Sequence, residues 1–135
     1  MSVKPSNAPA VLVIDDQASN LHLHAGVLRK AGYEVDTCDD ADAGLKILQH
    51  KPYQAVLLDI MLGGKSGLDI LHEVRGNPGR NRDTPIIVYT SDASPVNRQQ
   101  AAVFGASMFL ERPIRPLDLL DAVELMVGDD SGDTA

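Results

Sequence analysis

Three aspartates follow two apolar segments of the chain. Asp15 and Asp16 come directly after the apolar run 11–14, and Asp59 follows the apolar run 55–58. Each run has the length and composition of a short strand that is buried on both faces of a parallel sheet. The carboxyl ends of such strands meet at one edge of the sheet, where ligands bind. If the two strands are neighbours, the three carboxylates lie together at that edge.

Like charges gathered at one edge repel one another, so a divalent cation or a proton must offset them. Carboxylate oxygens are the ligands that the hard cation Mg²⁺ prefers. The acidic cluster therefore predicts a magnesium site and phosphoryl chemistry. Taken alone, Asp15 and Asp16 could equally be a capping pair at the start of a helix.

The composition restricts the classes of protein to consider. A chain of 135 residues with 44% hydrophobic residues has the size and apolar content of one domain. Its formal net charge of −7 argues against a surface for nucleic acid or anionic membrane. Cys38 is the one cysteine, so no internal disulfide can form. Because no signal peptide or membrane-spanning stretch is recognisable, we expect a cytoplasmic protein.

Segments with strand and helix patterns alternate along the chain. The expected strands cover residues 10–14, 33–38, 54–59, 85–90 and 107–110, and the expected helices cover residues 17–30, 41–50, 66–75, 94–105 and 116–127. Strict alternation predicts an α/β, flavodoxin-like doubly wound fold. In that fold a five-stranded parallel sheet has the order 2-1-3-4-5 and helices cover both faces, so the first and third strands are neighbours.

The same pattern predicts details of individual segments. Alternating polar and apolar residues in the second strand favour an edge position. The apolar side of the last helix is expected to consist of Leu117, Leu120, Val123 and Leu125. We expect a flexible N-terminus over residues 1–9, one domain over residues 10–127, and an acidic disordered tail over residues 128–135.

Over about residues 10–127 the chain resembles the receiver domain of bacterial two-component response regulators. The residues that carry the resemblance are the acidic pair Asp15 and Asp16, Asp59 at the phosphoacceptor position, Gly67 eight residues later, Thr90 after the fourth strand, and Arg112-Pro113 after the fifth. Each motif alone is weak, whereas the set at matching spacing is specific.

The resemblance implies chemistry at the acidic cluster. Asp59 would be the nucleophile that attacks phosphorus and forms an aspartyl phosphate. Asp15, Asp16, Asp59 and the backbone carbonyl of Met61 would hold Mg²⁺, which neutralises phosphoryl oxygens and orients the attack. Such a protein is a signalling switch that catalyses only its own phosphorylation and dephosphorylation, and not an enzyme in the ordinary sense.

Three further residues receive roles from the resemblance. Thr90 would hydrogen-bond one phosphoryl oxygen and Arg112 would pair with another. The attraction for Thr90 would open a space into which Phe109 turns, which would remodel the surface of the fourth helix, fifth strand and fifth helix. Phe109 could equally be an ordinary core aromatic.

The chain departs from the family pattern at four positions: 63, 91, 109 and 112. At residue 91 serine stands where a smaller residue is common, and Phe109 lacks the hydroxyl of the tyrosine often found there. Arg112 stands where the family has lysine, and its planar fork is wider than an ammonium group. Arg112 could also be a solvated loop residue paired with Glu111. Gly63 replaces the family proline four residues after the acceptor.

Two functions from different classes remain. A response regulator would take phosphate from a sensor histidine kinase or a phosphotransfer protein and control a protein effector through the face described above, with homodimer formation left open. A pseudo-receiver would bind partners without phosphorylation because Arg112 replaces lysine. A phosphatase of the haloacid dehalogenase type is disfavoured, since its D-x-D pattern on the first strand is missing at Asp15 and Asp16.

Overall fold

The computed structural model describes residues 8–128, and within them five parallel strands form one sheet. These strands are β1 (Ala10–Ile14), β2 (Glu34–Cys38), β3 (Ala55–Asp59), β6 (Ile86–Thr90) and β7 (Met108–Glu111). Their order is β2-β1-β3-β6-β7, which confirms the predicted doubly wound topology. The labels β4 (Met61–Leu62) and β5 (Lys65–Ser66) belong to a separate antiparallel pair that the sequence analysis did not anticipate.

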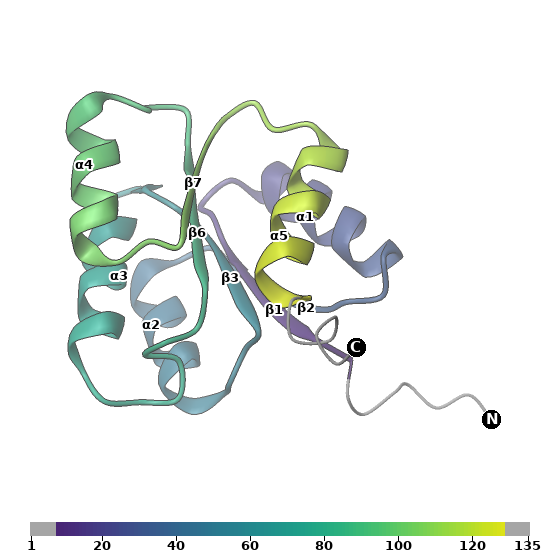
Figure 1. Ribbon diagram of the computed structural model, residues 1–135, viewed down its shortest axis with the longest axis horizontal. Helices are drawn as coiled ribbons and strands as arrows, with labels where there is room; N and C mark the ends of the chain where they lie inside the picture. Colours follow the sequence, from purple (N-terminus) through teal and green to yellow (C-terminus); the bar gives the residue numbers. More distant parts are fainter. Residues whose placement is uncertain (1–7, 129–135) are drawn as a thin grey trace.

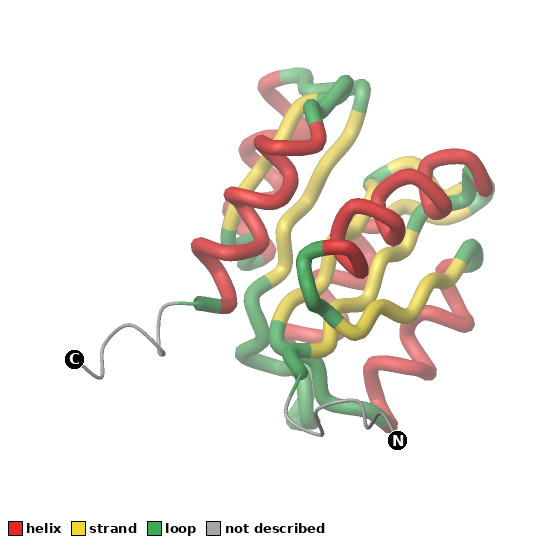
Figure 2. Tube along the Cα trace, turned by 90° about the vertical axis from the view of Figure 1, so that its right-hand side faces the viewer, coloured by secondary structure: helices red, strands yellow, loops and turns green. Residues whose placement is uncertain are grey.

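Helices cover both faces of the sheet (Figures 1 and 2). One face carries α1 (Ala18–Lys30) and α5 (Pro116–Val127), and the other carries α2 (Ala41–His50), α3 (Gly67–Gly76) and α4 (Pro95–Phe104). The strands therefore bury both faces. Leu12 and Ile14 of β1 belong to one hydrophobic cluster, whereas Val11 and Val13 belong to the other. This arrangement explains why β1 is apolar at every position.

Polar caps set the helix boundaries beside the site. The side chains of Asp40, Ser66 and Ser94 each accept a hydrogen bond from a backbone N–H in the first turn of α2, α3 and α4. Gly105 ends α4 with a φ of 101°, a left-handed conformation that glycine adopts without strain. These signals were readable in the sequence, so the predicted and observed helices differ by one residue or less at most ends.

Strand ends differ slightly from the prediction because pairing, not composition, defines them. Tyr33 was expected in the second strand, but its N–H donates to the carbonyl of Leu28 and so completes the end of α1. The fifth strand extends to Glu111, which pairs with Thr90. The predicted edge position of the second strand is confirmed, since β2 lies at one end of the sheet.

The predicted apolar side of α5 is wrong in part. Leu117 and Leu125 are 72% and 58% exposed, whereas Leu119, Ala122 and Val123 are buried. A helix buries residues about 3.6 positions apart. The buried set follows that period, whereas the predicted set was chosen for its hydrophobicity and spans both sides of the helix.

The predictions for the two ends of the chain stay predictions. The expected flexible N-terminus and acidic tail fall mostly in residues 1–7 and 129–135, outside the described residues. Over residues 8–128, none of the helices has the length and apolar character needed to cross a membrane.

Candidate phosphoryl and metal site

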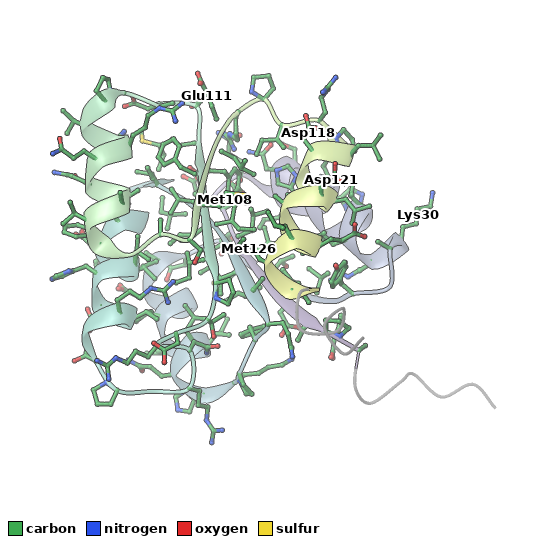
Figure 3. All side chains as sticks on the ribbon, in the orientation of Figure 1. Lys30, Met108, Glu111, Asp118, Asp121 and Met126 are labelled. Atoms are coloured by element: carbon green, nitrogen blue, oxygen red, sulfur yellow. The ribbon has the colours of Figure 1, made fainter. Side chains whose placement is uncertain are left out.

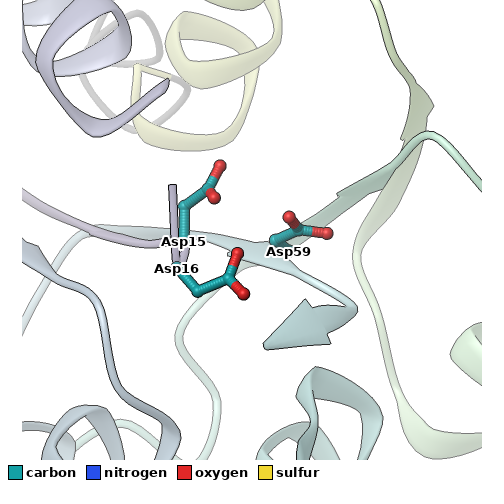
Figure 4. Close-up of side chains that lie close together, drawn as sticks. All are labelled: Asp15, Asp16 and Asp59. Carbon is teal, nitrogen blue, oxygen red and sulfur yellow. The ribbon is translucent and has the colours of Figure 1, made fainter. Parts of the chain in front are cut away.

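The order of strands brings the three aspartates together. β1 and β3 are neighbours, with Ile14 opposite Leu58, so the residues that follow lie at the same edge of the sheet. Carboxylate oxygens of Asp15, Asp16 and Asp59 all lie within 4.8 Å of one another (Figure 4). Their donor set consists of oxygen atoms alone, which suits Mg²⁺.

The three carboxylates differ in their surroundings. Asp15 and Asp59 are 0% and 2% exposed, whereas Asp16 is exposed at the mouth of the cluster. Oδ1 of Asp15 accepts a hydrogen bond of 2.9 Å from the N–H of Gln17, the residue that caps α1. This bond closes a turn before α1 and does not cap the helix, since the N-cap residue Gln17 has no side-chain cap hydrogen bond. The capping interpretation of Asp15 and Asp16 is therefore wrong, and Asp15 belongs to the acidic cluster.

Backbone contacts fix the position of Asp59. Its Oδ1 accepts a hydrogen bond of 3.0 Å from the N–H of Met61. The N–H of Gly67 donates to the carbonyl of Ile60 at 2.7 Å, which draws the start of α3 against the end of β3. A Cβ atom at residue 67 would lie 2.1 Å from the Asp59 carbonyl oxygen. Only glycine permits this approach.

The hairpin formed by β4 and β5 lies beside the same cluster. Its turn contains Gly63, whose φ of 64° is closed to the proline that the family has there. A Cβ atom at residue 63 would lie 3.8 Å from Oδ2 of Asp16. The side chain of Met61 is half exposed, and its backbone N–H contacts the Asp59 carboxylate.

Burial raises the pKa of the Asp59 carboxyl to about 6. The negative charges of Asp15 and Asp16 act in the same direction, whereas the Met61 N–H and Arg112 lower this pKa. The cation-free site therefore resists full ionisation. Burial is the main cause, and the repulsion that the sequence predicted for clustered acids contributes less.

We expect Asp59→Asn to stabilise the cation-free protein at about pH 7.5. A carboxyl pKa that is higher in the folded than in the unfolded chain means that ionisation destabilises the fold, by up to ~3 kcal/mol here. That cost is small below about pH 4 and grows as the pH rises to about 6. Asparagine resembles the neutral acid, so the gain should shrink by more than half at about pH 4.5. Denaturant unfolding in EDTA measures it, and a gain independent of pH would contradict this assignment.

Arg112 contacts the buried acids. Its Nη1 atom lies 3.3 Å from Oδ2 of Asp15 and 3.6 Å from Oδ2 of Asp59, and its side chain is 17% exposed. Glu111 instead pairs with Arg98 of α4 at 3.3 Å. The alternative in which Arg112 is a solvated partner of Glu111 is therefore wrong.

Thr90 ends β6 next to this group. It is fully buried, its carbonyl accepts a hydrogen bond of 2.9 Å from the N–H of Arg112, and its hydroxyl accepts one of 3.1 Å from the N–H of Asp92. Phe109 lies on β7, packed on the side of α2, α3 and α4. The guanidinium of Arg98 lies over its ring, 4.8 Å from the centroid.

Two buried polar residues near the cluster were missed by the sequence analysis. The hydroxyl of Tyr89 donates a hydrogen bond to Oδ2 of Asp15. The ring of His24 meets the Tyr89 ring edge to face, with centroids 5.4 Å apart and an interplanar angle of 82°. Burial lowers the pKa of His24 and, with the bond to Asp15, raises that of Tyr89. A tyrosine in an otherwise aliphatic strand was the available signal, because a buried phenol needs a hydrogen-bond partner.

Comparison with known proteins agrees with this geometry. The family model of the response regulator receiver domain matches residues 11–124. A curated relative, the sensory/regulatory protein RpfC of Xanthomonas campestris, is 32% identical over 114 residues, which is 84% of this chain and 16% of RpfC. The chain spans half or less of the length of the first curated relatives that it matches.

Two solved structures share the fold. A response regulator from Burkholderia pseudomallei, with a phosphorylated aspartic acid and a calcium ion, is 27% identical with a TM-score of 0.79, over 94% of this chain and 73% of that one. The receiver domain of the sensor histidine kinase PA1611 from Pseudomonas aeruginosa, with magnesium in its active-site cleft, has a TM-score of 0.82. It is 24% identical, and the match covers 90% of this chain and 99% of that one.

Proposed function

Because the chain belongs to the family of response regulator receiver domains, we propose that it accepts a phosphoryl group on Asp59 and thereby changes how it binds a partner. The single observation that carries this proposal is the convergence of the Asp15, Asp16 and Asp59 carboxylates within 4.8 Å at one sheet edge. Arg112 and Thr90 border the same group. The phosphorylated aspartate of the Burkholderia regulator supports the proposal.

The residues present fit a magnesium ion. Asp15, Asp16, Asp59 and the carbonyl of Met61 would hold it, and bound Mg²⁺ would neutralise the phosphoryl oxygens. The ionised Asp59 carboxylate attacks phosphorus, an O–P bond forms, and the bond to the donor's leaving atom breaks with its electron pair. Arg112 then pairs with a phosphoryl oxygen, and Thr90 donates its hydroxyl to another. We also propose that the receiver domain covers residues 10–127.

The signal would leave the site through Thr90 and Phe109. A phosphoryl group adds nearly two negative charges, so it attracts the Thr90 hydroxyl and vacates space for Phe109. The face formed by α4, β7 and α5 contains a groove of about 430 Å³ between β7 and α5. Glu111, Asp118 and Asp121 border it (Figure 3). We propose this face as the effector surface, and self-association stays a prediction.

We propose that the phosphoryl donor is a sensor histidine kinase or a phosphotransfer protein. We also propose that the receiver acts in the cytoplasm. Incubation with acetyl phosphate and Mg²⁺, followed by intact-mass measurement, tests the central step. We expect one phosphoryl adduct that depends on Mg²⁺ and maps to Asp59. Absence of an adduct under these conditions would favour the pseudo-receiver, in which Arg112 disables the site.

Arg112→Lys is expected to retain phosphorylation and to change its lifetime or the affinity for the partner. The guanidinium reaches both Asp15 and Asp59, whereas an ammonium group is a compact point charge on a flexible stem. The decay of the adduct after removal of acetyl phosphate measures its lifetime. If the wild type and Arg112→Lys have equal transfer rates, adduct lifetimes and partner affinities, the planar guanidinium of Arg112 has no role beyond its charge.

A further inference from the structure

An arginine in this pocket needs more support than a lysine does. Its guanidinium is planar and presents its donors in fixed directions, so its orientation decides which oxygens it reaches. Here one nitrogen, Nη1, serves both buried acids, Asp15 Oδ2 at 3.3 Å and Asp59 Oδ2 at 3.6 Å. A small rotation of the group would lose one of the two contacts.

Tyr89 is the side chain that touches both Arg112 and an acid of the cluster. The guanidinium carbon of Arg112 lies over the Tyr89 ring, 5.4 Å from the centroid, within the range of a cation–π contact. The Tyr89 hydroxyl donates to Asp15 Oδ2, the same oxygen that Arg112 engages. In the ion pair between Arg112 and Asp15, the Tyr89 ring therefore contacts the guanidinium and the Tyr89 hydroxyl contacts the carboxylate.

The Tyr89 ring is itself held in place. Tyr89 is completely buried in β6, and the His24 ring of α1 packs against it. His24 is 5% exposed, and its Nε2 atom has no hydrogen-bond partner among the described residues, so the contact with Tyr89 is a packing contact. The ring consequently presents a fixed surface to Arg112.

We propose that Tyr89 is a positioning residue that holds Arg112 and Asp15 in the orientation needed for phosphoryl transfer. Its ring orients the Arg112 guanidinium and its hydroxyl orients the Asp15 carboxylate. This inference rests on the proposed phosphoryl transfer to Asp59 and adds a specific requirement: the ring matters when residue 112 is arginine and loses its importance when residue 112 is lysine.

The test is a cycle of variants at two positions. Tyr89→Phe keeps the ring, Tyr89→Leu removes it, and each is combined with Arg112→Lys. The rate of Asp59 modification by acetyl phosphate with Mg²⁺ is measured for each protein. Tyr89→Leu should react about 10-fold more slowly than Tyr89→Phe while Arg112 is present, and at most about 2-fold more slowly when both proteins also carry Arg112→Lys. An equal loss in the two backgrounds would show that Tyr89 only fills the core, and would overturn the proposal.

A spectroscopic measurement tests the same contact without phosphate or metal. In the wild type and in Tyr89→Phe, ring currents should displace the side-chain resonances of Arg112, and in Tyr89→Leu the displacement should vanish. Side-chain resonances of Arg112 that are the same in all three proteins would contradict the proposal. If the wild type forms no adduct, the proposed function fails, and this spectrum alone decides the role of Tyr89.

Tyr53→Leu is the matched control for Tyr89→Leu. Tyr53 is also buried, and its hydroxyl donates to a carboxylate, Asp36, at 2.6 Å. This pair lies at the β2 edge beside Lys51, away from Arg112. We expect Tyr53→Leu to leave the modification rate and the Arg112 resonances unchanged. A loss equal to that of Tyr89→Leu would indicate a general effect of weakened packing and would overturn the specific role.

Discussion

Asp59→Asn abolishes the phosphoryl adduct, whatever the concentration of acetyl phosphate, if the proposed chemistry is right. The amide has no anionic oxygen to attack phosphorus, and the O–P bond cannot form at this position. Intact mass after incubation with acetyl phosphate and Mg²⁺ measures the result. The fold should persist, because asparagine has the same shape and the buried negative charge is removed.

A matched control separates this effect from a general loss of negative charge. Asp42 is exposed and pairs with Lys65 at 2.6 Å, outside the acidic cluster. Asp42→Asn should form the same adduct as the wild type. A full adduct on Asp59→Asn would place the acceptor elsewhere in the chain and would refute the proposed role of Asp59.

Gly67→Ala is expected to cause the largest loss of stability of any single methyl added near the site. The new Cβ would lie 2.1 Å from the Asp59 carbonyl oxygen and 3.0 Å from its carbon, and neither backbone atom can move without displacing the end of β3. Overpacking and backbone shifts of this kind cost roughly 2–4 kcal/mol. Because the displaced strand end carries Asp59, affinity for Mg²⁺ should also fall.

Gly26→Ala provides the comparison for this prediction. Gly26 lies within α1, and nothing would come within 4 Å of its Cβ. Alanine is the better helix former, so the variant should gain roughly 0.5–1 kcal/mol. Denaturant unfolding of both variants measures the effects. If Gly67→Ala is as stable as Gly26→Ala, the close approach of α3 to β3 is not a feature of the protein in solution.

The position of the acidic cluster could be predicted because it depends on strand order alone. Alternating elements allow few topologies, and the doubly wound one places Asp15 and Asp59 at the same sheet edge. Helix ends could also be predicted, because helices start at capping residues such as Asp40, Ser66 and Ser94, and α4 ends at Gly105. These predictions needed no knowledge of how side chains pack.

Features that depend on packing across the sheet could not be predicted in the same way. The contact of Tyr89 with Asp15 joins residues 74 positions apart, and no local pattern specifies it. The side of α5 that is buried depends on the rotation of the helix against the sheet. The ion pairs of Arg112 are a further example. Glu111, its neighbour in the chain, pairs with Arg98 of α4, whereas Arg112 pairs with Asp15 and Asp59.

The central claim is that residues 15, 16, 59, 90 and 112 form one site for a cation and a phosphoryl group, and a magnesium titration followed by NMR tests it most directly. In the ¹⁵N-labelled protein, the amide signals of Asp15, Asp16 and Asp59 should shift along one saturable binding curve. The amides of Asp118 and Asp121, exposed acids on α5, should not follow it. If the shifts instead centre on α5, or if none of the three cluster signals moves, the acidic edge of the sheet is not a cation site.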